Sequence, residues 1–156
     1  MKKIKFVSFW LLLTAGMATV VFNSCGSSGA AKTGSFSKVA ITAPKSIDVK
    51  ILECEPEGDK VVMTLLLTNR GEEISYYLIQ KGRAIDNLGN EYATSFAFGQ
   101  KTGSNYTSLS TGVPIKLYIK IGNSGQTINS KATHFAVVEA TAYSGDKYTF
   151  KNVPLK

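Results

Sequence analysis

The sequence predicts an all-β protein built from antiparallel strands. From residue 47 onward, apolar and polar residues alternate with a period of two, and turn residues recur about every 8–12 positions. No stretch keeps a helical period long enough for a crossover helix, which excludes a parallel, doubly wound sheet. The length of 156 residues and the hydrophobic content of 44% fit one domain with a substantial core.

The first two strands are expected at 48–55 and 60–68, joined by the turn Glu57-Gly58-Asp59. In the first, Val49 and Ile51 share a face, and a bulge near Leu52 shifts the alternation. The second (KVVMTLLLT) is apolar on both faces, which is typical of a central strand.

A turn at 69–72 precedes strand material that we expect to break at Gly82, giving segments 74–81 and 83–87. The Asn/Gly sequence at 87–90 is typical of a tight hairpin loop, and the returning strand is expected at 91–98.

A polar loop at 99–111, with a short strand near Tyr106, leads to the clearest alternation in the chain, at 113–122. After a second loop at 122–131, a terminal hairpin is expected from 133–143 and 147–153. Residues 39–42 could add a short edge strand. This count of strands predicts an immunoglobulin-like β-sandwich of about seven to nine strands, with an eight-stranded calyx as the alternative.

The first 24 residues have the form of a secretory signal. Three lysines precede an apolar run at 6–22, and the small residue Ser24 stands before Cys25. Val21, Ser24 and Cys25 resemble the lipobox of bacterial lipoproteins. Phe22 and Asn23 depart from its strict pattern and resemble the relaxed lipoboxes of Bacteroidetes-type bacteria. The resemblance implies a lipid on the Cys25 thiol; an uncleaved helical anchor and ordinary cleavage are the alternatives.

Three regions follow: a lipoprotein signal peptide (1–24), a flexible tether (25–43) and the β-sandwich domain (44–156). The tether is rich in Gly and Ser and would reach roughly 20–25 Å. By the sorting rule of the resembled lipoproteins, Gly26 implies the outer membrane. The lack of an acidic cluster after Cys25 favours its periplasmic face.

Three turn motifs resemble the DUF4352-type, immunoglobulin-like lipoprotein domains, over roughly residues 48–122. These are Asn69-Arg70-Gly71-Glu72 after a strand, Asp86-Asn87-Leu88-Gly89-Asn90-Glu91-Tyr92 in a hairpin, and Leu109-Ser110-Thr111-Gly112 before the next strand. The resemblance implies an accessory or interaction domain of the envelope and brings no catalytic residues with it.

The charge is unevenly distributed. The formal net charge of +7 falls to +4 without residues 1–24, because fifteen basic and eleven acidic residues remain. Residues 25–91 have a balance of −1 and residues 92–156 a balance of +5, which could mark a face for anionic polymers or only a solubilising surface. The basic half contains no Arg, which argues against dedicated phosphate recognition.

Few residues offer catalytic or metal chemistry. His134 is the only histidine, no G-x-S-x-G motif is present, and Cys54 is expected to pack as a small apolar residue. No metal site is predicted, although oxygen-rich groups around Glu53 and Glu55 and around Asp86 and Asn90 are weak calcium candidates. Solvated strand ends and turns are the ordinary alternative.

A candidate ligand surface combines aromatic and basic residues. Phe96 and Phe98 face one way, so an aromatic strip could stack on sugar rings, and the core is the alternative location for such residues. The full candidate set is Phe96, Phe98, Tyr106, Lys116, Tyr118 and Lys120.

Together these features predict a non-enzymatic, lipid-anchored envelope protein without a cofactor. Its expected partners are the membrane, through the anchor, and an envelope protein or glycan, with no nucleic acid. An envelope hydrolase with a site built from the loops at 99–111 and 122–131, or a purely structural lipoprotein, are the alternatives.

Overall fold

Nine antiparallel strands make up the fold in the computed structural model, which describes residues 36–122 and 125–155. The strands are β1 (Ala40–Thr42), β2 (Ile47–Glu57), β3 (Lys60–Asn69), β4 (Ile74–Asp86), β5 (Glu91–Phe98), β6 (Tyr106–Leu109), β7 (Pro114–Ile121), β8 (His134–Ala142) and β9 (Lys147–Pro154). Cys25 and the predicted signal and lipobox lie outside the described residues.

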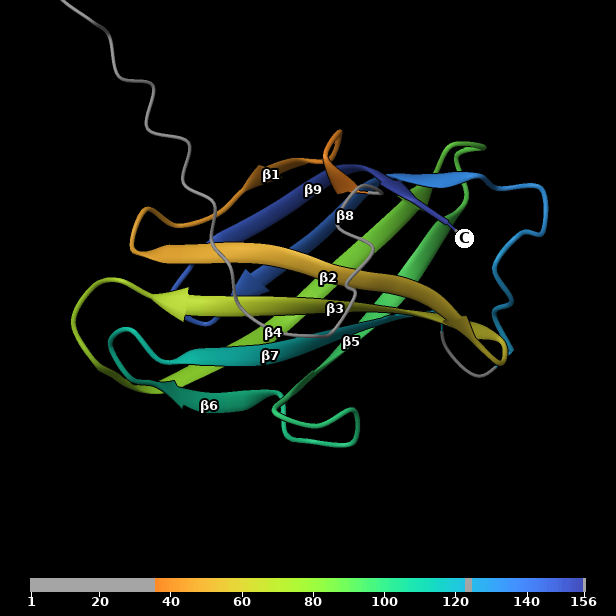
Figure 1. Ribbon diagram of the computed structural model, residues 1–156. Helices are drawn as coiled ribbons and strands as arrows, with labels where there is room; N and C mark the ends of the chain where they lie inside the picture. Colours follow the sequence, from red (N-terminus) through yellow and green to blue (C-terminus); the bar gives the residue numbers. More distant parts are fainter. Residues whose placement is uncertain (1–35, 123–124, 156) are drawn as a thin grey trace, which may run out of the picture.

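The strands form two layers. One sheet has the order β2-β3-β7-β5, and the other has the order β1-β9-β8-β4 with β6 beside β4. In Figure 1, β2, β3 and β7 run across the front, and β9, β8 and β4 pass behind them. This is the strand order of an immunoglobulin-like sandwich of the constant type, in which β2, β3, β7 and β5 occupy one sheet and β4, β8 and β9 the other.

β5 connects the two sheets. Its first residues pair with β4 (Ala93 with Arg83), and from Thr94 onward it pairs with β7. Through β5 the strands follow one another in the order β1-β9-β8-β4-β5-β7-β3-β2. No pairing joins the two end strands, β1 and β2, within the described part of the chain, so the sheet does not close into the alternative fold, a calyx.

The core lies between the sheets and is filled by the inward residues that the alternation predicts. Leu65, Leu67, Leu117, Ile119 and Phe150 are all fully buried there. Strand β3 lies between β2 and β7, which confirms the central position predicted from its two apolar faces. The bulge predicted near Leu52 is also present, as a register shift between Ile51 and Glu53.

One expected strand break is wrong, and one expected edge strand is present. β4 runs without a break through Gly82, because the strand pairs on both sides of this residue with β8. The short edge strand expected at residues 39–42 is present as β1: Ala40–Thr42 pair with β9, and Phe36, Val39 and Ala43 pack against the core, so this part of the expected tether belongs to the folded domain. The folded domain therefore extends at least eight residues toward the N-terminus from Pro44, to Phe36.

Candidate functional site

The hairpin motif Asp86-x-x-Gly-x-x-Tyr is a buried polar network. Asp86 is 1% exposed, and its Oδ1 accepts the backbone N–H groups of Leu88 and Asn90 at 2.8 and 2.9 Å. Its Oδ2 accepts the Asn90 amide at 2.8 Å and the Tyr92 hydroxyl at 2.9 Å. Burial alone raises the pKa of Asp86, but the hydrogen bonds from Asn90, Tyr92 and Leu88 outweigh it, so the pKa lies below its ordinary value.

These hydrogen bonds bear on whether Asp86 and Asn90 could bind calcium. Four donors occupy the four lone-pair positions of the Asp86 carboxylate, and the Asn90 side chain is one of those donors. A cation would have to displace them, so the geometry argues against Asp86 and Asn90 as ligands.

The other calcium candidates lie on β2. Glu53 accepts a hydrogen bond from the Thr64 hydroxyl at 2.9 Å, and Glu55 is exposed. In the described ranges, no group of three or more His, Cys, Asp or Glu side chains is arranged to hold a metal ion.

The motifs at Asn69 and Leu109 meet in a second buried network. The fully buried Asn69 amide donates to the carbonyls of Glu72 (2.7 Å) and Leu109 (3.0 Å), and its Oδ1 accepts the N–H of Gly71 at 2.9 Å. Its backbone carbonyl accepts the N–H of Gly112 at 2.7 Å. The turn motifs therefore hold loops together, and both polar atoms of the Asn69 side chain are engaged in this role.

The candidate ligand residues do not come together as one surface. Phe96 (9% exposed) and Phe98 (6% exposed) lie in the core, which corrects the prediction that they could form an exposed strip. Lys116, Tyr118 and Lys120 lie on the outer face of the sheet that contains β7, where Tyr118 is largely covered and packs with Val62 and Ala97. Tyr106 belongs to β6, beside β4 in the other sheet.

Tyr106 packs against an aromatic residue that is not in the candidate set, Tyr76. Its ring lies 5.4 Å from that of Tyr76, at an interplanar angle of 32°, and the two residues are 50% and 57% exposed. Alternation along β4 carries the signal that could have found this pair: Tyr77 faces the core, so Tyr76 must face outward.

His134 and Cys54 have structural environments. The ring Nδ1 of His134 is 3.0 Å from the Thr133 hydroxyl, and its backbone N–H donates to Asn87 Oδ1. Cys54 is fully buried in β2, which confirms the prediction that it packs as a small apolar residue.

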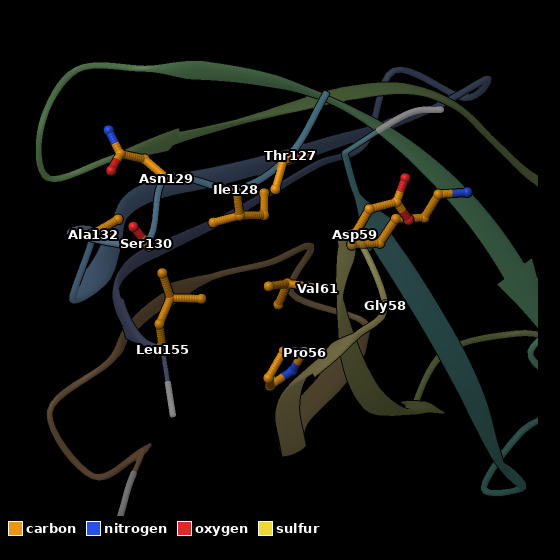
Figure 2. Close-up of a pocket in the computed structure, with 11 residues that line it drawn as sticks. Pro56, Gly58, Asp59, Val61, Thr127, Ile128, Asn129, Ser130, Ala132 and Leu155 are labelled. Carbon is orange, nitrogen blue, oxygen red and sulfur yellow. The ribbon is translucent and has the colours of Figure 1, made fainter. Parts of the chain in front are cut away.

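A hollow of about 210 Å³ opens at one end of the sandwich, between the β2–β3 turn, the loop before β8 and the C-terminal residues. Figure 2 shows the apolar side chains of Pro56, Val61, Ile128 and Leu155 around it, with Asp59 at its edge. Asp59 is the one carboxylate among the lining residues, and the volume is below the 300–1,000 Å³ that is typical of small-molecule sites. The hollow thus lacks the paired groups that acid–base hydrolysis requires.

No protein-family model matches the chain, and no curated protein or solved structure shows significant similarity to it. The part of the chain that the structure describes contains no helix long and apolar enough to cross a membrane. The fold and the geometry of its surface are therefore the basis for a functional assignment.

Proposed function

We propose that this protein is a lipid-anchored, non-catalytic domain of the bacterial cell envelope that binds a glycan or protein partner. The anchor is Cys25, and the proposed location is the outer membrane, on its periplasmic side. The lipobox-like sequence around Cys25 and the Gly/Ser-rich segment after it support the anchor.

The observation that carries the binding proposal is the exposed tyrosine pair, Tyr76 and Tyr106, on the outer face of the sheet that contains β4 and β6. Half-exposed aromatic side chains that stack on each other offer a preformed contact surface at little cost in conformational entropy. The buried polar side chains of Asp86 and Asn69 are occupied by structural hydrogen bonds.

The test is a pull-down with the tagged full-length chain in detergent, using envelope extract and identifying captured proteins and glycans by mass spectrometry. We expect a specific envelope component to be captured. Failure to capture any component above a tag-only control would contradict the binding proposal.

The anchor is tested separately with Cys25→Ala. We expect the wild-type chain to incorporate labelled fatty acid and to sediment with membranes, because two or more acyl chains give stable anchoring. The variant should lose the label and the membrane association. A variant that keeps both would refute lipidation at Cys25, and Cys54→Ala is the matched control that should change neither.

A further inference from the structure

The outer face of the sheet β4-β8-β9 has a second exposed aromatic group beside the tyrosine pair. The backbone N–H of Tyr143 donates to the carbonyl of Leu78 at 2.8 Å, while Leu78 pairs with Tyr106 on its other side. Tyr143 is 71% exposed, more than any other large apolar or aromatic residue in the described part of the chain. Three exposed tyrosines therefore surround Leu78 at one end of this face.

Two lysines continue the same face along the strands. Lys81 on β4 and Lys147 on β9 both pair with Thr141 on β8, so they stand on either side of it. Their backbones are two strand spacings apart, about 10 Å. Together with Thr149 and Glu139, these residues line a hollow of about 250 Å³.

The two lysines have no carboxylate partner within residues 36–122 and 125–155. The ion pairs there join Arg70 to Asp48, Arg83 to Glu139, and Lys101 to Glu57. Because Arg83 neutralises Glu139, the positive charge of Lys81 and Lys147 is uncompensated on this face.

We propose that this tyrosine–lysine face (Tyr76, Lys81, Tyr106, Tyr143 and Lys147) binds an acidic polysaccharide that carries carboxylates. This inference rests on the proposed function, since it names the class of partner and the surface that binds it. The tyrosine rings pack against the apolar faces of the sugars, and the two ammonium groups pair with the carboxylates. The hydroxyls of Thr141, between the lysines, and of Thr149, two residues from Lys147 on β9, suit the hydroxyl edges of a sugar.

Two features favour this ligand over a nucleic acid or a peptide. Recognition of the phosphates of a nucleic acid favours arginine side chains, which bind two oxygens at once. Arg83, the arginine beside the hollow, already forms an ion pair with Glu139. A peptide would need pockets for its apolar side chains, but the hollow is lined mainly by charged and hydroxyl-bearing residues.

The test measures binding to the full-length chain in detergent by titration calorimetry. The probes are an oligogalacturonate, a neutral galactan oligosaccharide of the same length and an oligothymidylate. We expect the oligogalacturonate to bind most tightly and to weaken with added salt, because the exposed ion pairs are screened. Tyr106→Ala should reduce its affinity about tenfold, corresponding to about 1.4 kcal/mol.

The double variant Lys81→Gln, Lys147→Gln separates charge from stacking, and because both side chains are exposed it should leave the fold intact. It should lower the affinity for the oligogalacturonate about tenfold or more and leave that for the neutral oligosaccharide unchanged. Lys116→Gln, on the opposite face of the sandwich, is the matched control and should change nothing.

Three results would overturn the inference: no binding of the oligogalacturonate, binding that neither the tyrosine nor the lysine variants weaken, or tighter binding of the oligothymidylate. The envelope pull-down shows whether only the acidic-polysaccharide inference fails or the proposed binding function fails as well. If the Tyr106→Ala variant and the double lysine variant capture an envelope component as well as the wild type does, the domain binds a partner through another surface.

Discussion

Asp86 and Asn69 are polar residues with almost no exposed surface, and the side chain of each holds a loop in place. Asp86 holds its own hairpin, and Tyr92, which donates to it, also accepts the N–H of Asn129 at 3.1 Å. Asn69 joins the end of β3 to Leu109 at the end of β6 and to Gly112 in the loop after it. Such groups stabilise a fold because their loss leaves buried donors without acceptors.

Asp86→Asn tests this network and its pH dependence. The new amide would face the Tyr92 hydroxyl and the Asn90 amide, so we expect a loss of about 2 kcal/mol in the free energy of unfolding at neutral pH. The pKa of Asp86 is lowered from 3.8 in the folded state, so its contribution is fully present above that pH. The contribution is lost as the pH falls below 3.8 toward the folded pKa.

The gap between wild type and Asp86→Asn in urea unfolding should therefore narrow as the pH falls below 3.8. Asp48→Asn is the control, because Asp48 forms an exposed ion pair with Arg70 that is worth little. A gap that stays constant between neutral pH and acid would show that the charge of Asp86 is not what stabilises the hairpin.

Strand β4 shows where sequence patterns succeed and where they fail. Alternation locates its inward residues, and the Asn/Gly loop locates its end at Asp86. The break expected at Gly82 is wrong, because a glycine within a strand can mark either an interruption of the strand or the close approach of another backbone. Here the second applies: an added Cβ would lie 2.2 Å from the Glu139 carbonyl oxygen on β8 and 2.7 Å from the Phe96 ring.

Gly82→Ala should therefore destabilise the fold by about 3 kcal/mol, because β8 or β5 must move to accommodate the methyl group. Urea unfolding measures the loss. Gly58→Ala is the control: its φ of +65° imposes about 1 kcal/mol of backbone strain, but no atom lies within 4 Å of the added Cβ. If the two variants lose the same free energy of unfolding, the close approach of β8 to Gly82 does not contribute to the cost of the substitution.

Across the molecule, the sequence predicts the class of fold better than its surface. Period-two alternation and turn residues are local signals, and they locate the strands to within a few residues, apart from the false break within β4. Which outward residues share a face depends on pairings between distant strands, such as Lys81 with Thr141 and Thr141 with Lys147. For this reason Lys116 and Tyr106 were grouped although they lie on opposite sheets, and Tyr143 and Lys147 were not recognised.

A hydrogen bond between residues distant in the chain also connects β4 to β9 inside the core. The hydroxyl groups of Tyr77 on β4 and Tyr148 on β9 hydrogen-bond to each other, and both residues are almost fully buried. Tyr77 also donates to Asp146 at 3.4 Å. Burial raises the pKa of Tyr148 to about 12 and that of Tyr77 further above its ordinary value.

Since an unfolded tyrosine ionises near pH 10, these raised pKa values stabilise the fold fully below pH 10. That contribution is lost as the pH rises through the folded pKa, so the protein should unfold in alkali. A spectrophotometric titration should show that Tyr77 and Tyr148, two of the seven tyrosines, ionise only as the fold is lost. Tyr148→Phe should cost about 1 kcal/mol at neutral pH but lose stability less steeply above pH 10. Tyr143→Phe, which changes an exposed tyrosine, should change neither the stability at neutral pH nor its loss above pH 10.

If all seven tyrosines ionise near pH 10 while the near-UV circular dichroism stays native, the buried pair does not exist in solution.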